Sequence, residues 1–126
     1  MAEKASITKQ SVKKIACERY YVALVALFDI DPDRVRRFLV RLTYQPDGPE
    51  HDAAIDSIRH LSVMRSDERP EFFVETIRRF IWAMNEEGGN NAWSAPEIIG
   101  AVIAGNPEEY GQYFSFAFFA AEDEKM

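Results

Sequence analysis

The sequence predicts an all-α fold of five or six helices, and two observations carry this prediction. All six prolines are followed directly by an acidic residue, and five of these pairs, such as Pro32-Asp33 and Pro96-Glu97, stand at predicted helix starts. Proline suits the first turn of a helix, where its missing N–H would have no partner, and a carboxylate there meets the positive end of the helix dipole. Apolar residues recur at helical spacing after these starts, whereas no stretch alternates for long enough to predict a strand.

Length and charge limit the class of protein. A chain of 126 residues with 47% hydrophobic residues can bury one core without metals or disulfides, so we expect a single domain over residues 1–126. The net charge of −6 argues against nucleic-acid binding, which uses a basic surface. A lone cysteine, Cys17, favours a reducing, cytoplasmic compartment. The longest apolar run, residues 20–28, is shorter than the about 20 residues of a membrane span, so no membrane association is expected.

The first three helices are predicted over residues 8–28, 32–43 and 49–65. In the first helix, the residues expected to face inward are Ile15, Val22, Val25 and Ala26. In the second, apolar residues at i, i+3, i+4 and i+7 form one buried stripe, which consists of Val35, Phe38, Leu39 and Leu42. In the third, the inward residues are Ala54, Ile55, Ile58, Leu61 and Ser62.

The last three helices are predicted over residues 70–87, 95–104 and 107–121. Gly88-Gly89 and Gly105 end the first two, because glycine accepts the left-handed conformation of a helix C-terminus. Gly100 lies inside a predicted helix at a cost of up to about 1 kcal/mol, which predicts that another helix approaches closely there. The predicted N-caps are Asp31, Asp47, Ser94 and Asn106, and each of the last three has an acid at capping-box spacing.

The spacing of the helix pairs suggests a repeat. Pro32 and Pro70 begin successive pairs and lie 38 positions apart, close to the ~40 residues of a HEAT-type unit. We therefore expect a HEAT-like α-α superhelix. Its predicted parts are an N-terminal helix at residues 8–28, helix pairs at residues 32–66 and 70–105, and a terminal helix at residues 107–121.

The C-terminal part of the chain carries a recognisable order of residues. Trp82 is followed by Asn-Glu-Glu-Gly-Gly, then by Trp-Ser-Ala-Pro-Glu, and then by Asn-Pro and Tyr110. This order resembles a family of short HEAT-repeat-like proteins from anaerobic bacteria and archaea. The residues Gly89-Asn90-Asn91-Ala92-Trp93 depart from it, because asparagine partly replaces the family's small and apolar residues. The resemblance implies a helical fold and no particular reaction, since the family has no established activity.

The candidate binding residues lie in and beside the predicted loop at residues 85–93. They are Trp82, Asn85, Glu86, Glu87, Asn90, Asn91 and Trp93. Their carboxylate and amide oxygens suit a hard cation such as calcium, but the spacing is not that of an EF-hand loop. We favour helix ends and turn residues as the explanation, and we predict no metal and no cofactor.

Trp82 lies opposite the apolar stripe of its predicted helix. We expect a neighbouring helix to cover it, because large apolar residues are usually buried. The alternative is an aromatic anchor for a partner protein, a role in which tryptophan is enriched.

Other combinations of residues are weaker. One helix face carries Asp52, Asp56 and His60, which could bind a metal. A metal site needs ligands that converge on one point, and this spacing alone does not imply that they do. No nucleophile–base pair or phosphate loop is recognisable, which argues against an enzyme.

The predicted terminal helix is apolar on all sides, so neighbours must pack against more than one of its faces. Either the N-terminal helix covers it or a second copy of the chain does. The hypothesis is a homodimer through Tyr110, Tyr113, Phe114, Phe116, Phe118 and Phe119. The function predicted first is a small soluble HEAT-like interaction or scaffold module. The alternatives are a small-molecule- or metal-dependent activity in a pocket near Trp82, Glu86, Glu87 and Trp93, and a structural subunit of a larger complex.

Overall fold

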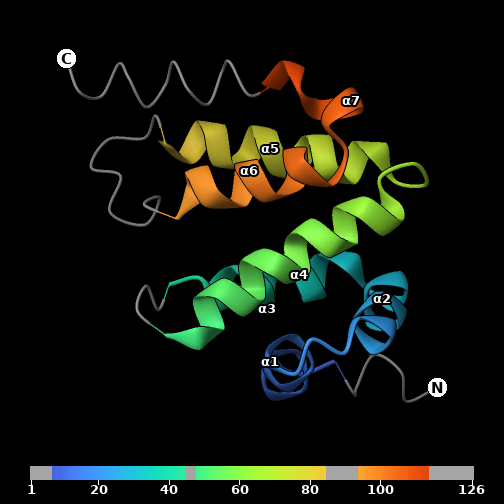
Figure 1. Ribbon diagram of the computed structural model, residues 1–126, viewed down its shortest axis with the longest axis vertical. Coiled ribbons are helices and arrows are strands. Elements are labelled where there is room, and N and C mark those ends of the chain that lie inside the picture. Colours follow the sequence, from blue (N-terminus) through green and yellow to red (C-terminus); the bar gives the residue numbers. More distant parts are fainter. Residues whose placement is uncertain (1–6, 45–47, 85–93, 114–126) are drawn as a thin grey trace. The chain divides into compact units, whose positions relative to one another are not determined.

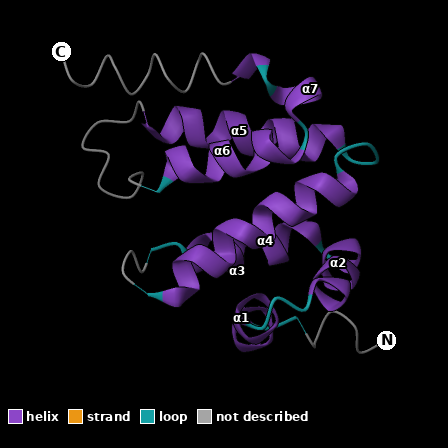
Figure 2. Ribbon diagram, viewed as in Figure 1, coloured by secondary structure: helices purple, strands orange, loops and turns teal. Residues whose placement is uncertain are grey.

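The computed structural model describes residues 7–44, 48–84 and 94–113. Within these ranges the chain forms seven α-helices and no strand (Figures 1 and 2). The helices are α1 (Lys9–Cys17), α2 (Tyr21–Ile30), α3 (Pro32–Leu42), α4 (Pro49–Arg65), α5 (Pro70–Met84), α6 (Ala95–Gly105) and α7 (Pro107–Tyr110). The predicted all-α fold is confirmed.

The chain divides into two compact units, Met1–Leu61 and Ser62–Met126, with the boundary inside α4. In the first unit, α1, α2 and α3 pack against one another. Their fully buried side chains include Val12, Leu24, Phe28, Val35 and Leu39. Phe28 is the one aromatic ring among these five side chains.

The first unit differs from its prediction at residues 17–21. One helix was expected over residues 8–28, and that expectation is wrong, because α1 ends at Cys17 and α2 begins at Tyr21. Arg19 has a positive φ of 55°. The Arg19 N–H donates to the Ala16 carbonyl and the Tyr20 N–H to the Ile15 carbonyl, each at 3.0 Å. This pair of bonds is a Schellman motif, which ends a helix and commonly has glycine where Arg19 stands.

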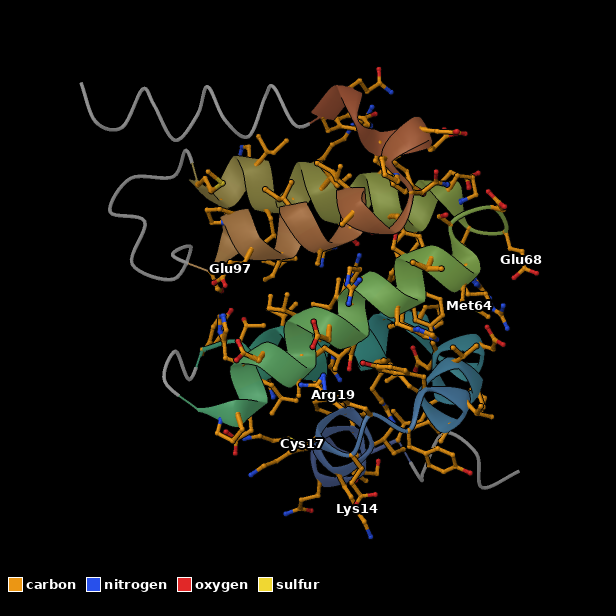
Figure 3. All side chains as sticks on the ribbon, viewed as in Figure 1. Lys14, Cys17, Arg19, Met64, Glu68 and Glu97 are labelled. Atoms are coloured by element: carbon orange, nitrogen blue, oxygen red, sulfur yellow. The ribbon has the colours of Figure 1, made fainter. Side chains whose placement is uncertain are left out.

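Arg19, whose left-handed conformation costs about 1–2 kcal/mol in a non-glycine residue, and its neighbour Tyr21 both contact α4. Arg19 Nη1 donates to Asp56 Oδ2 at 2.6 Å. Arg19 is labelled in Figure 3. Tyr21 stacks on the His60 ring with the centroids 4.2 Å apart. The break also changes the buried face, so that Val22, which was expected to face inward, is 77% exposed.

In the second unit, α5 and α6 lie side by side and antiparallel, and α7 packs on α6 (Figure 1). The apolar residues of α6 are almost all buried, including Ile98, Ile99 and Val102. Ser62 Oγ, at the end of α4, donates to the Val102 carbonyl at 2.7 Å. This bond satisfies a buried hydroxyl and ties α4 to α6 inside the unit.

Two of the predicted N-caps are confirmed. Asp31 Oδ1 accepts from the Arg34 N–H at 3.2 Å, and Asn106 Oδ1 accepts from the Glu109 N–H at 3.3 Å. Ser94 stands at the predicted N-cap position of α6, but the predicted side-chain cap is wrong, because its side chain makes no capping hydrogen bond and its backbone is helical, with φ −91° and ψ −2°. An N-cap side chain reaches the first turn from an extended backbone, which Ser94 does not have. Asp47 lies outside the described residues.

The expected close approach at Gly100 is also wrong. A Cβ placed on Gly100 would meet nothing within 4 Å, whereas one placed on Gly111 would lie 2.6 Å from the Pro107 carbonyl oxygen. Gly100 therefore has no packing reason to be glycine within the described structure.

Replacing Gly100 with alanine is expected to raise the free energy of unfolding by about 0.5–1 kcal/mol, because alanine has the higher helix propensity and the space is open. Urea unfolding followed by circular dichroism measures this change. Gly111→Ala is the control and should be destabilising, since its methyl group collides with backbone. A Gly100→Ala chain less stable than the wild type would show that an unrecognised neighbour occupies this position.

Candidate functional site

Most of the predicted site lies outside the residues that the structure describes. Asn85, Glu86, Glu87, Asn90, Asn91 and Trp93 lie outside the described residues. The same holds for Phe114, Phe116, Phe118 and Phe119 of the predicted dimer surface. Of the seven candidate binding residues in and beside the loop, Trp82 is the one with a described position, and of the predicted dimer surface Tyr110 and Tyr113 are described.

Trp82 lies on the last turn of α5, and its side chain is 67% exposed. The opposite face of α5 carries the buried side chains of Phe73, Thr76, Ile77 and Met84. The expectation that a neighbouring helix covers Trp82 is therefore wrong. It failed because α6 packs along the apolar face of α5, while the polar face that carries Trp82 remains open.

Trp82 belongs to a row of exposed side chains along α5, which we name the α5 outer stripe: Glu71, Glu75, Arg78 and Trp82. These residues stand at i, i+4, i+7 and i+11, the spacing of one helix face. The stripe is acidic in its first half, and in its second half it carries a cation and an indole ring. The sequence analysis did not include Glu71 among the candidates, although its helical spacing from Trp82 would have identified it.

The charges near the centre of the stripe are organised by one intrahelical pair. Arg79 Nη2 lies 2.8 Å from Glu75 Oε2, and both side chains are about half exposed. An exposed pair at i and i+4 adds only a few tenths of a kcal/mol to stability. Arg78 makes no ion pair within the described chain, so its charge is available on the surface of α5.

The possible metal ligands on α4 do not form a metal site; they are Asp52, Asp56 and His60. Asp56 is engaged by Arg19 at 2.6 Å, and His60 stacks on Tyr21. Burial lowers the pKa of His60, and the nearby Arg59 charge lowers it further. These groups anchor α4 to the α1–α2 junction, and among the described residues no three His, Cys, Asp or Glu side chains converge as metal ligands.

A shallow depression of about 250 Å³ lies on α1. It is lined by Gln10, Lys13, Lys14, Cys17 and Glu18, of which Lys14 and Cys17 are labelled in Figure 3. Lys13 Nζ lies 3.6 Å from Glu50 Oε2 of α4. Among the described residues no histidine lines the depression beside Cys17, so they offer no imidazole base to activate a thiol nucleophile there.

Tyr110 has a different position from the one expected of a dimer contact. Its side chain is fully buried within its own unit, with the Phe73 ring centroid 6.5 Å away. Burial raises the pKa of Tyr110 to about 12, against a smaller lowering by the neighbouring Ser66 hydroxyl. The Tyr110 hydroxyl makes no hydrogen bond of good geometry within the described structure, and Ser66 Oγ instead accepts from Asn106 Nδ2 at 2.9 Å. A second copy of the chain cannot reach this ring.

None of the described helices combines the length and the apolar character that crossing a membrane requires. Comparison with known proteins gives no match to a family model, to a curated protein or to a solved structure. The function proposed below therefore rests on the geometry of the described residues.

Proposed function

We propose that this chain is a small protein-interaction module and that the α5 outer stripe is its binding surface. The observation that carries the proposal is the 67% exposure of Trp82 on a helix whose other face is buried. A tryptophan side chain offers about 150–250 Å² to a partner. Tryptophan is also enriched among the few residues that supply most of the binding free energy at interfaces.

The neighbours of Trp82 suit the edge of such an interface. Arg78 stands one turn before it, and the Arg79–Glu75 pair lies beside Arg78. Charged groups at a rim contribute more to orientation and specificity than to affinity. An apolar anchor with both signs of charge nearby favours a protein partner over a nucleic acid, which would need a uniformly basic surface.

The HEAT-like architecture and the family resemblance are part of this proposal. The antiparallel packing of α5 on α6 supports one helix-pair unit of that kind, over residues 70–105. A scaffold role follows from the fold only by analogy. A cytoplasmic location is supported by the single cysteine of the chain, which suits a reducing compartment.

Trp82→Ala is expected to weaken capture of a partner at least about 30-fold, the effect of removing a side chain that supplies 2 kcal/mol or more of binding free energy. The measurement is quantitative capture from an extract of the source cells on the immobilised full chain. Tyr44→Ala is the matched control, since Tyr44 is also an exposed aromatic, at 43%, on the other unit. Both variants remove exposed side chains and should fold normally, as circular dichroism would verify.

Equal capture by the wild-type chain and the Trp82→Ala chain would contradict the proposal. Loss of capture by the Tyr44→Ala chain alone would move the binding surface to the other unit.

A further inference from the structure

We infer that the α5 outer stripe pairs with the same stripe of a second copy of this chain, with the two α5 helices antiparallel. This inference rests on the proposed binding surface and names the partner that fits it. It follows from the order of side chains in the stripe, from the charges at its centre and from the position of Trp82.

The stripe is symmetric along the helix. Its members are separated by four, three and four residues, so both the outer pair, Glu71 and Trp82, and the inner pair, Glu75 and Arg78, are centred between residues 76 and 77. A twofold axis through that point, perpendicular to α5, would make the surface face itself. In such an interface, residue i contacts residue j of the partner while j contacts i.

The charges select the antiparallel orientation. Across the twofold axis, Glu75 faces the partner's Arg78, and Arg78 faces the partner's Glu75. A parallel arrangement would instead place like charges opposite each other, which is unfavourable. Arg78 has no ion pair within the described chain, whereas Arg79 already holds Glu75 at 2.8 Å. The Glu75 carboxylate can therefore bridge Arg79 and the partner's Arg78.

The same axis covers the exposed indole. Trp82 lies across the first turn of the partner's α5, over the aliphatic part of the partner's Glu71. The indole N–H is a donor that usually finds an acceptor when the ring is buried, and the carboxylate of the partner's Glu71 supplies one. The symmetric contact covers both tryptophans at once, one at each end of the interface.

A single helix pair of this kind buries less than the about 1,200 Å² of a standard interface. The dimer is therefore expected to be weak, with a dissociation constant on the order of tens of micromolar. It should also weaken as salt is added, because its two central ion pairs are accessible to solvent.

The test is sedimentation equilibrium of the full chain at low ionic strength, from about 5 to 300 µM, spanning the expected weak association. The wild-type chain should pass from monomer to dimer. Arg78→Glu and Glu75→Arg should each weaken dimerisation at least about tenfold, because each places two like-charged pairs across the axis. The double variant Glu75→Arg/Arg78→Glu should recover the dimer, since both pairs are restored with the signs exchanged. Arg37→Glu, an exposed change on α3, is the control for net charge.

The outcomes separate this inference from the proposed function. A wild-type chain that stays monomeric at the highest concentration overturns the second copy as partner. If Trp82→Ala still abolishes capture of a cellular protein, the proposed binding surface survives that result. A dimer that tolerates both single charge reversals, or a double variant no better than the singles, overturns the antiparallel α5 pairing.

Discussion

Replacing Phe28 with alanine is expected to lower the free energy of unfolding by about 3–5 kcal/mol, the usual cost of removing a buried aromatic ring. Phe28 is fully buried on α2, in the core that α2 forms with α1 and α3. The loss has two parts, the transfer of the ring from water into the core and the cavity that remains. A small unit has few other large side chains with which to close that cavity.

Val22→Ala on the same helix is the matched control. Val22 is 77% exposed, so its truncation is expected to change stability by no more than about 0.5 kcal/mol. Denaturant unfolding of both variants under the same conditions measures the difference. If Val22→Ala proved as damaging as Phe28→Ala, Val22 would have to lie in the core. That result would contradict the orientation of α2 about its own axis.

Local rules predicted most helix starts because the signal is contained within one turn. Helices begin at Pro32, Pro49, Pro70 and Pro107, where a proline precedes an acid. Proline and the helix dipole act on the backbone next to them, so distant parts of the fold do not change the outcome.

The end of α1 was missed for the opposite reason. No glycine, proline or asparagine stands at residues 17–20, so no local stop signal exists. Arg19 takes the left-handed conformation, and its side chain contacts Asp56, thirty-seven positions along the chain. Contacts of that range cannot be read from a window of neighbouring residues.

Trp82 shows a second limit of sequence reasoning. A helical wheel places it opposite the apolar stripe, and that placement is correct. The wheel cannot tell whether another helix covers that side, because covering depends on how successive helices pack. The HEAT-like interpretation supplied a covering layer, and the structure instead leaves the ring 67% exposed. Its exposure, together with its residue type, makes Trp82 a candidate for binding.

Raising the pH above about 10 is expected to destabilise the folded chain through Tyr110. The pKa of Tyr110 in the folded chain is about 12, against about 10 in an unfolded chain. Between these values the unfolded chain has lost the phenolic proton while the folded chain keeps it. The folded state therefore binds more protons, and its stability falls as pH rises. The loss is expected to begin near pH 10 and to reach about 2–3 kcal/mol by pH 12.

Tyr110→Phe isolates this effect from the titration of other groups. Phenylalanine cannot ionise, so the difference in stability between the two chains should move in favour of the variant as pH rises from 9 to 12. At pH 7 the variant should be as stable as the wild type or up to about 1 kcal/mol more stable, because the substitution removes a buried hydroxyl without a good hydrogen bond. Urea unfolding of both chains across this pH range is the measurement. A variant less stable at pH 7 would show that the hydroxyl bonds to Ser66, and parallel pH curves would show that Tyr110 is accessible to water. A ring accessible to water could contact a partner. The expected divergence of the two stability curves with pH instead assigns Tyr110 to the core, and the α5 outer stripe then remains the candidate binding surface.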